Sequence, residues 1–185
     1  MKDIINKEGY SLTDVDMRFY SPEGSKLLTY KELTKCKTLD EALGSSGILI
    51  LLYLTTGDHY GHWCTVFKHE FDKNNKKLKI PSIEFFDSYG KVIDEPLKYA
   101  DKDVRIRNNE VLPYLSKLIY ESGYNIEYND YKLQKSSPDV ATCGRHVLVR
   151  LACKDMNIDD YVELLFKDKK HDPDYIVTYL TDFLP

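Results

Sequence analysis

The sequence lacks any long apolar run and any excess of positive charge. Its longest apolar stretch, residues 47–54, falls far short of the ~20 residues that cross a bilayer, and residues 1–20 hold no apolar segment typical of a signal peptide. The formal net charge of −4 argues against a general nucleic-acid binder, although residues 72–79 concentrate lysines in what we interpret as a solvated hairpin loop. We therefore expect an intracellular protein that is not bound to a membrane.

Cysteines are few, and no two of them form a recognisable motif. The chain contains Cys36, Cys64, Cys143 and Cys153, with no CxxC pair and no dense framework, so neither a zinc ribbon nor a disulfide scaffold is indicated. We expect reduced thiols, no metal and no cofactor. With 185 residues, of which 42% are hydrophobic, the chain suffices for one substantial core. A single domain over residues 1–185 is therefore predicted.

The spacing of apolar residues changes along the chain from helical to strand-like and back to helical. The front section is largely helical, because Ser11 or Thr13 can cap a short helix and Gly44 ends a further helical segment. Strands are predicted at residues 47–54, 62–71, 81–90 and 125–134, and later helices at 108–124, from near Cys143, at 158–168 and at 172–184. This order predicts an α+β fold, a small central sheet with helices on its sides.

Cys143 stands where a polar loop gives way to helical spacing. The apolar stripe formed by Val147, Leu148, Leu151 and Ala152 predicts a helix that begins close to Cys143. A thiol at a helix N-terminus faces unpaired backbone N–H groups and the positive end of the helix dipole, which favour the thiolate and so produce a nucleophile. A small apolar residue at a helix start would give the same local pattern, so the rest of the chain has to decide.

A cysteine nucleophile needs a base, a group that orients the base, and donors for the oxyanion. His171 lies in a charged segment, and His69 lies near the far end of its strand, so neither is favoured as the base. His146 shares a helix with Cys143 and has no obvious acidic partner nearby, and we expect it to pack as an ordinary core residue. His59 and His62 remain as candidates.

His62 is favoured because of where the strands begin and end. It starts the second predicted strand and Asp87 ends the third, so a hairpin pairing would bring an imidazole and a carboxylate together. Cys64 is a rival nucleophile on the same strand face, roughly 6 to 7 Å from His62 by strand rise, but it lacks a helix dipole, and we interpret it as a buried strand residue. Trp63 alternates to the opposite face, where packing is its expected role.

Four short motifs occur in the order His, Asp, Gln, Cys: "HW" at 62–63, "FFDSYG" at 85–90, Gln134 in "YKLQ", and "TCG" at 142–144. This order resembles the adenain-like cysteine peptidases of clan CE, papain-like enzymes that include adenovirus maturation protease and proteases that remove small ubiquitin-like modifiers. Within the clan, the sequence looks most like the maturation proteases of virophages and Polinton-type DNA viruses. The resemblance covers roughly residues 45–155 and implies a mixed sheet with the nucleophile at a helix N-terminus.

The resemblance implies a role for each of these residues. Cys143 would be the nucleophile, His62 the general base and later acid, and Asp87 the residue that holds the imidazole. Gln134 would donate a side-chain N–H to the oxyanion together with the backbone N–H of Cys143, as suits a neutral amide with two donors. Trp63 and Gly144, which follow the base and the nucleophile, are the expected substrate contacts.

The implied activity is that of a thiol endopeptidase, a hydrolase that cleaves viral capsid precursors after glycine during virion maturation. It would act as a monomer on a protein substrate, in the virion or in the cytoplasm or virus factory of the host cell, and the adenoviral relative suggests an activating peptide or DNA. The alternatives are a protease that removes ubiquitin-like modifiers from host proteins and a non-catalytic binding module on the same fold. The intact Cys143, His62 and Asp87 set argues against the binding module.

Overall fold

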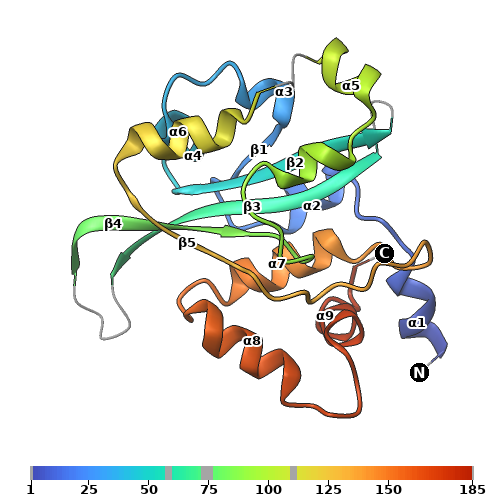
Figure 1. Cartoon of the computed structure of the whole chain (residues 1–185). Helices are drawn as coiled ribbons and strands as arrows, with labels where there is room; N and C mark the ends of the chain where they lie inside the picture. Colours follow the sequence, from blue (N-terminus) through green and yellow to red (C-terminus); the bar gives the residue numbers. More distant parts are fainter. Residues whose placement is uncertain (1, 57–59, 72–76, 109–111, 185) are drawn as a thin grey trace.

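The computed structural model describes residues 2–56, 60–71, 77–108 and 112–184, and a five-stranded sheet lies at its centre (Figure 1). The strand order β1-β2-β3-β4-β5 follows the chain. The central strands β2, β3 and β4 pair antiparallel, and the edge strands β1 and β5 pair parallel to their neighbours, so the sheet is mixed. The strands are β1 Lys26–Thr29, β2 Ile48–Thr56, β3 Tyr60–Phe71, β4 Lys77–Phe86 and β5 Asn125–Tyr128.

Helices flank the sheet on both faces (Figure 1). On one face, α7, α8 and α9 pack with side chains from the α2 region, and on the other, α3, α4, α6 and η1 pack together. The predicted α+β fold is thereby confirmed. The helices are α1 Lys2–Glu8, α2 Asp14–Tyr20, α3 Tyr30–Leu33, α4 Leu39–Leu43, η1 Glu95–Tyr99, α5 Lys102–Arg107, α6 Tyr114–Ser122, α7 Cys143–Ala152, α8 Ile158–Phe166 and α9 Pro173–Leu180.

Several predicted boundaries are confirmed by caps. Thr13 caps α2 with a capping box, and Gly44 and Gly123 end α4 and α6 at positive φ, a conformation that costs glycine little. Helix α7 begins at Cys143, as the apolar stripe predicts. No helix in the described part of the chain is long and apolar enough to cross a membrane.

Two predictions about the sheet are wrong. The front section contains a strand, β1, whose short sequence gives no clear alternation and which forms by pairing with Leu49–Leu52 of β2. The strand predicted at residues 125–134 ends at Tyr128. After it, the backbone N–H of Tyr131 donates to the Asn129 side chain and not to a neighbouring strand. His59 and residues 72–76 of the basic loop lie outside the described residues.

Helix α7 is buried on all sides over most of its length, so its charged residues need partners within the protein. Arg150 donates from Nε and Nη2 to the two carboxylate oxygens of Glu84 on β4, at 2.8 and 2.7 Å, and both side chains are fully buried. Burial by itself would raise the pKa of Glu84, but hydrogen bonds from His69 and Arg150 lower it below its usual value. Removing one partner of such a buried pair typically costs ~3–5 kcal/mol, so this contact fixes α7 firmly against the sheet.

Candidate active site

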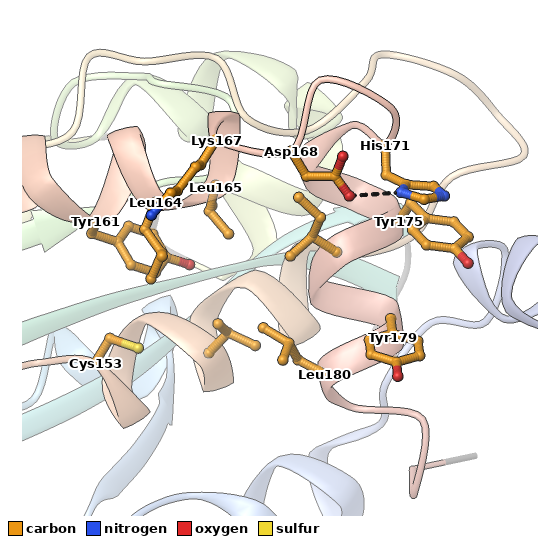
Figure 2. A pocket seen from close by; sticks show the side chains of 12 residues that line it. Cys153, Tyr161, Leu164, Leu165, Lys167, Asp168, His171, Tyr175, Tyr179 and Leu180 are labelled. Atoms are coloured by element: carbon orange, nitrogen blue, oxygen red, sulfur yellow. Dashed lines mark hydrogen bonds and ion pairs between the residues drawn. The ribbon is translucent and has the colours of Figure 1, made fainter.

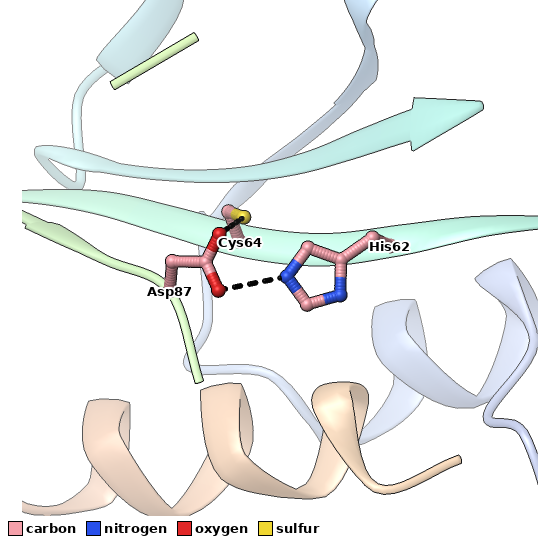
Figure 3. Close-up of side chains that lie close together, drawn as sticks. All are labelled: His62, Cys64 and Asp87. Atoms are coloured by element: carbon pink, nitrogen blue, oxygen red, sulfur yellow. Dashed lines mark hydrogen bonds and ion pairs between the residues drawn. The ribbon is translucent and has the colours of Figure 1, made fainter. Parts of the chain in front are cut away.

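The β3–β4 hairpin brings His62 and Asp87 into contact. The strand register pairs Thr65 with Phe86, so Asp87, which follows β4, lies beside the start of β3. His62 Nε2 and Asp87 Oδ1 are 3.0 Å apart, and the carboxylate is fully buried (Figure 3). Because a carboxylate only accepts hydrogen bonds, Nε2 carries the proton and Nδ1 is left free to accept one.

Other groups hold the carboxylate and the imidazole in place. Tyr89 donates its backbone N–H to Asp87 Oδ1 at 2.7 Å, and its ring stacks on the His62 ring with centroids 4.9 Å apart. The Asn129 side chain donates to the backbone carbonyl of Asp87 at 2.7 Å. Neither Tyr89 nor Asn129 is among the predicted site residues, although Tyr89 lies inside the "FFDSYG" motif.

The charges around His62 favour its protonated form. Burial by itself would lower the pKa of His62, but the Asp87 carboxylate that contacts its Nε2 raises it well above its ordinary value, and Cys143 adds to this increase. The interaction with Cys143 links the helix that starts at Cys143 to the strand that carries His62. A cysteine beside an imidazole is an arrangement in which the imidazole can take the proton of the thiol.

Cys143 is the first residue of α7 and its side chain is buried, with 6% of the residue exposed. As a first-turn residue, it has a backbone N–H without an intrahelical acceptor. Gly144 packs so closely against the α2 region that an added Cβ would come within 3.1 Å of Leu12 Cβ and of Met17 Sδ. Trp63 is also buried there, and its indole N–H donates to the Leu12 carbonyl at 3.0 Å. Both residues thus support the start of α7 through packing.

Gln134 is buried next to Ser88, the residue that follows Asp87. Its Oε1 accepts from the Ser88 hydroxyl at 2.7 Å, and its backbone N–H donates to the Ser88 carbonyl at 2.8 Å. With Oε1 occupied in this way, the side-chain NH₂ is the end of the amide that can donate to another group. Ser88 is a further residue that the sequence analysis did not single out.

Cys64 lies on the other side of the Asp87 carboxylate, where its Sγ is 3.6 Å from Oδ2 (Figure 3). Burial, followed by the charge of Asp87, raises the pKa of this thiol far above its ordinary value. A protonated, fully buried thiol is a poor nucleophile, so this environment disfavours Cys64 as the rival of Cys143.

The side chains of His62, Cys64 and Asp87 each carry an atom of a kind that can bind a metal ion. These atoms lie within 4.8 Å of one another. A metal would need Cys64 as a thiolate, which its raised pKa opposes. The hydrogen bonds between the three side chains already use the atoms that would ligate. The cluster therefore fits a hydrogen-bonded network better than a metal centre.

The remaining described histidines have acidic partners of their own. His69 Nε2 lies 3.4 Å from Glu84, and His171 Nδ1 lies 2.8 Å from Asp168 on the surface. The expectation that His146 lacks an acidic partner is wrong, because α9 supplies Asp174, with His146 Nε2 3.0 Å from Asp174 Oδ1. Both side chains are fully buried. Asp174 is too distant in sequence for any local pattern to have indicated it.

A pocket of about 680 Å³ lies between α8 and α9 (Figure 2). Its lining is largely apolar and includes Tyr161, Leu165 and Tyr175, with the Asp168–His171 pair at its rim. None of its lining residues belongs to the cluster around His62 and Cys143. The candidate active site is therefore the junction of β3, β4 and α7.

The fold and the site together define an α+β protein with a cysteine at a helix N-terminus, beside a histidine that an aspartate holds. In sequence, the chain is 35% identical over 184 residues to uncharacterized protein V9 of the Sputnik virophage, which covers 98% of this chain and 99% of V9. The chain therefore belongs to the family of this virophage protein. The predicted likeness to a virophage protein is confirmed at this level, and no protein-family model matches the chain.

Two solved structures resemble the chain weakly. The crystal structure of the ASFV pS273R protease is 17% identical, with a TM-score of 0.37, and the match covers 75% of this chain and 44% of that one. The crystal structure of HopZ1a in complex with IP6 is 17% identical, with a TM-score of 0.38, and the match covers 80% of this chain and 44% of that one. The chain thus spans less than half the length of each, and at such TM-scores the similarity carries no argument about activity.

Proposed function

We propose that the protein is a cysteine protease of the adenain-like type, with Cys143 as the nucleophile, His62 as the base and Asp87 as the residue that orients the base. The observation that carries this proposal is the His62 Nε2 to Asp87 Oδ1 contact of 3.0 Å, made by an imidazole that also interacts with Cys143 at the start of α7. Each of the three side chains thereby has a task that requires the other two.

The reaction would proceed by acyl transfer. Cys143 Sγ passes its proton to His62 Nδ1, and the sulfur attacks the carbonyl carbon of the peptide bond while the carbonyl electron pair moves to oxygen. Collapse breaks the C–N bond, and His62 gives the proton to the leaving amine. Water then attacks the thioester, His62 takes a proton from it, and the second collapse releases the new carboxyl group and returns the proton to sulfur.

The oxyanion of both tetrahedral intermediates would accept hydrogen bonds from the Gln134 side chain and the backbone N–H of Cys143. The orientation of the Gln134 amide supports this role, because Ser88 occupies Oε1 and leaves the NH₂ group as the free end. The Cys143 N–H suits the role because it lies in the first turn of α7.

We propose viral capsid precursors as substrates, cut after glycine within the virion or in the infected host cell. The family relation to a virophage protein supports a viral substrate. The buried position of Cys143, with Trp63 and Gly144 packed beside it, leaves little room for a side chain on the residue whose carbonyl is attacked. An activating peptide or DNA, and action as a monomer, remain predictions from the resemblance.

The proposal is tested by incubating the purified protein with a virophage capsid precursor and, in parallel, with a conjugate of a ubiquitin-like modifier. We expect cleavage of the precursor alone, and its loss in Cys143→Ala, which removes the sulfur without disturbing the helix. Cleavage of the conjugate alone would redirect the proposal to modifier removal. A folded wild-type protein that cuts neither these proteins nor a peptide library would favour the binding module.

The peptide library also tests which residue the protein accepts immediately before the cleaved bond. We expect glycine to be preferred, and a β-branched residue such as valine to be cut about 10²-fold more slowly, because the extra atoms misplace the carbonyl relative to sulfur. Peptides with phenylalanine or arginine there, cut as fast as glycine peptides, would refute the narrow site.

A further inference from the structure

Asp174 lies in the first turn of α9 and binds three groups, one in the segment that follows Gln134 and two at the start of α7. Its Oδ2 accepts from the backbone N–H of Lys135 at 2.9 Å. Its Oδ1 contacts His146 Nε2 at 3.0 Å and accepts from the Thr142 hydroxyl. Asp174, Thr142 and His146 are all fully buried. A carboxylate in such surroundings is stable only when donors surround it, as these do.

Each of these partners lies close in sequence to Gln134 or to Cys143, the two residues that are proposed to bind the oxyanion. Lys135 follows Gln134, Thr142 precedes Cys143, and His146 lies about one helical turn beyond Cys143 on α7. We infer that Asp174 is the positioning residue of the oxyanion site, holding the Gln134 segment and the start of α7 at a fixed separation. This inference rests on the proposed function, since it concerns the same site.

The chain between the two oxyanion donors has no regular structure that could hold them. Residues 129–142 form neither helix nor strand, so their position depends on individual hydrogen bonds. Thr142 occupies the N-cap position of α7, yet its hydroxyl donates to Asp174 instead of capping the helix. A displacement of about 1 Å in a catalytic group can cost about 10²-fold in rate, so a single carboxylate shared by both segments has a large effect on catalysis.

The Asp174–His146 pair is not a second catalytic pair. His146 is fully buried, and among the described residues its Nδ1 has no hydrogen-bond partner. Burial by itself would raise the pKa of Asp174, but hydrogen bonds from His146 and Thr142 and the backbone N–H of Lys135 lower it. Asp174 therefore stays ionised as a fixed acceptor.

The test compares two reagents that react with Cys143, only one of which needs the oxyanion site. A peptide aldehyde ending in glycinal adds reversibly to the thiolate, and its carbonyl oxygen becomes the oxygen of a hemithioacetal in that site. Iodoacetamide forms a carbon–sulfur bond and releases iodide, with no oxyanion. In Asp174→Asn we expect aldehyde affinity and kcat to fall about 10²-fold, while the alkylation rate of Cys143 changes less than about threefold.

A second variant covers the case in which Asp174→Asn does not fold. Thr142→Val keeps the shape of the side chain and removes only the hydroxyl, and we expect the same selective loss, about tenfold in aldehyde affinity. Asp168→Asn is the matched control, because it alters an aspartate–histidine pair on the surface, and it should change neither reagent's reaction. A double-mutant cycle adds a further check: in a Gln134→Ala background the loss caused by Asp174→Asn should shrink.

The outcomes separate this inference from the proposed function. If the wild-type protein cuts peptides and binds the aldehyde, and Asp174→Asn and Thr142→Val keep that affinity, Asp174 does not position the oxyanion site and the protease remains. Equal losses toward aldehyde and iodoacetamide would also overturn the inference, because they indicate a general disturbance of Cys143. A wild-type protein in which Cys143 reacts with neither reagent would overturn the proposed function itself.

Discussion

Two aspartate–histidine pairs flank the start of α7, and their contact lengths are identical. His62 meets Asp87 and His146 meets Asp174, each through Nε2 and Oδ1 at 3.0 Å. The surroundings differ. The His62 side chain is 11% exposed, and its ring interacts with Cys143, whereas His146 is fully enclosed and its second ring nitrogen has no partner among the described residues.

The group that meets the second nitrogen of the imidazole decides the chemistry of such a pair. In both pairs the carboxylate fixes one ring nitrogen, but in only one of them does the other nitrogen meet a group that can give up a proton. A short contact between histidine and aspartate therefore does not identify a catalytic base. The group on the far side of the ring does.

The largest effect should separate the two histidines. His62→Gln removes the proposed base, and we expect kcat to fall by about 10⁴-fold or more, because the sulfur of Cys143 could then no longer pass its proton to a neighbour. His146→Gln retains a donor toward Asp174 and should lose less than about tenfold. Steady-state cleavage of a glycine peptide measures both, with circular dichroism as the control for folding. The reverse order of losses would assign the base to His146.

The next effect concerns the carboxylate of the active pair. Asp87→Asn should lower kcat by about 10³-fold, since the imidazole loses the acceptor that fixes its tautomer and stabilises its charge. Asp87 also raises the pKa of His62, so its loss should lower that pKa and move the basic limb of the kcat/KM profile to lower pH. Unchanged rates together with an unchanged profile would remove Asp87 from the site.

A smaller effect is expected at the oxyanion. Gln134→Ala deletes one proposed donor and should lower kcat by about 10²-fold with little change in KM. Ser88→Ala frees Oε1 of the amide and should give a loss in the same direction that is smaller, about threefold to tenfold. A change confined to KM in Gln134→Ala would indicate a substrate contact instead of an oxyanion donor.

The smallest effect is expected at Cys64, which contacts Asp87 Oδ2, whereas His62 contacts Oδ1. Cys64→Ala leaves the His62–Asp87 contact intact and removes only a weak donor, so we expect activity within about threefold of wild type. Intact-mass spectrometry after brief iodoacetamide treatment should show one modified site that disappears in Cys143→Ala and persists in Cys64→Ala. An inactive Cys64→Ala beside an active Cys143→Ala would exchange their roles.

The features that could be predicted from the amino-acid sequence depend on residues close together along the chain. The apolar stripe after Cys143 determined where α7 begins, and the apolar runs on either side of the lysine-rich loop predicted the hairpin that places His62 beside Asp87. Helix caps and strand alternation express backbone hydrogen bonding within a few residues, so they can be read directly from local pattern. The virophage relationship was likewise carried by short motifs.

The contacts between segments that are distant in sequence could not be predicted in this way. Ser88 binds Gln134 across 46 positions and Asp174 binds His146 across 28, and no local spacing foretells either contact. Strand β1 exists because β2 offers it a parallel partner, and β5 is short because Asn129 turns the chain. These contacts depend on which faces of the sheet the helices cover, and that is set by the burial of the whole core together with the need to pair every buried polar group.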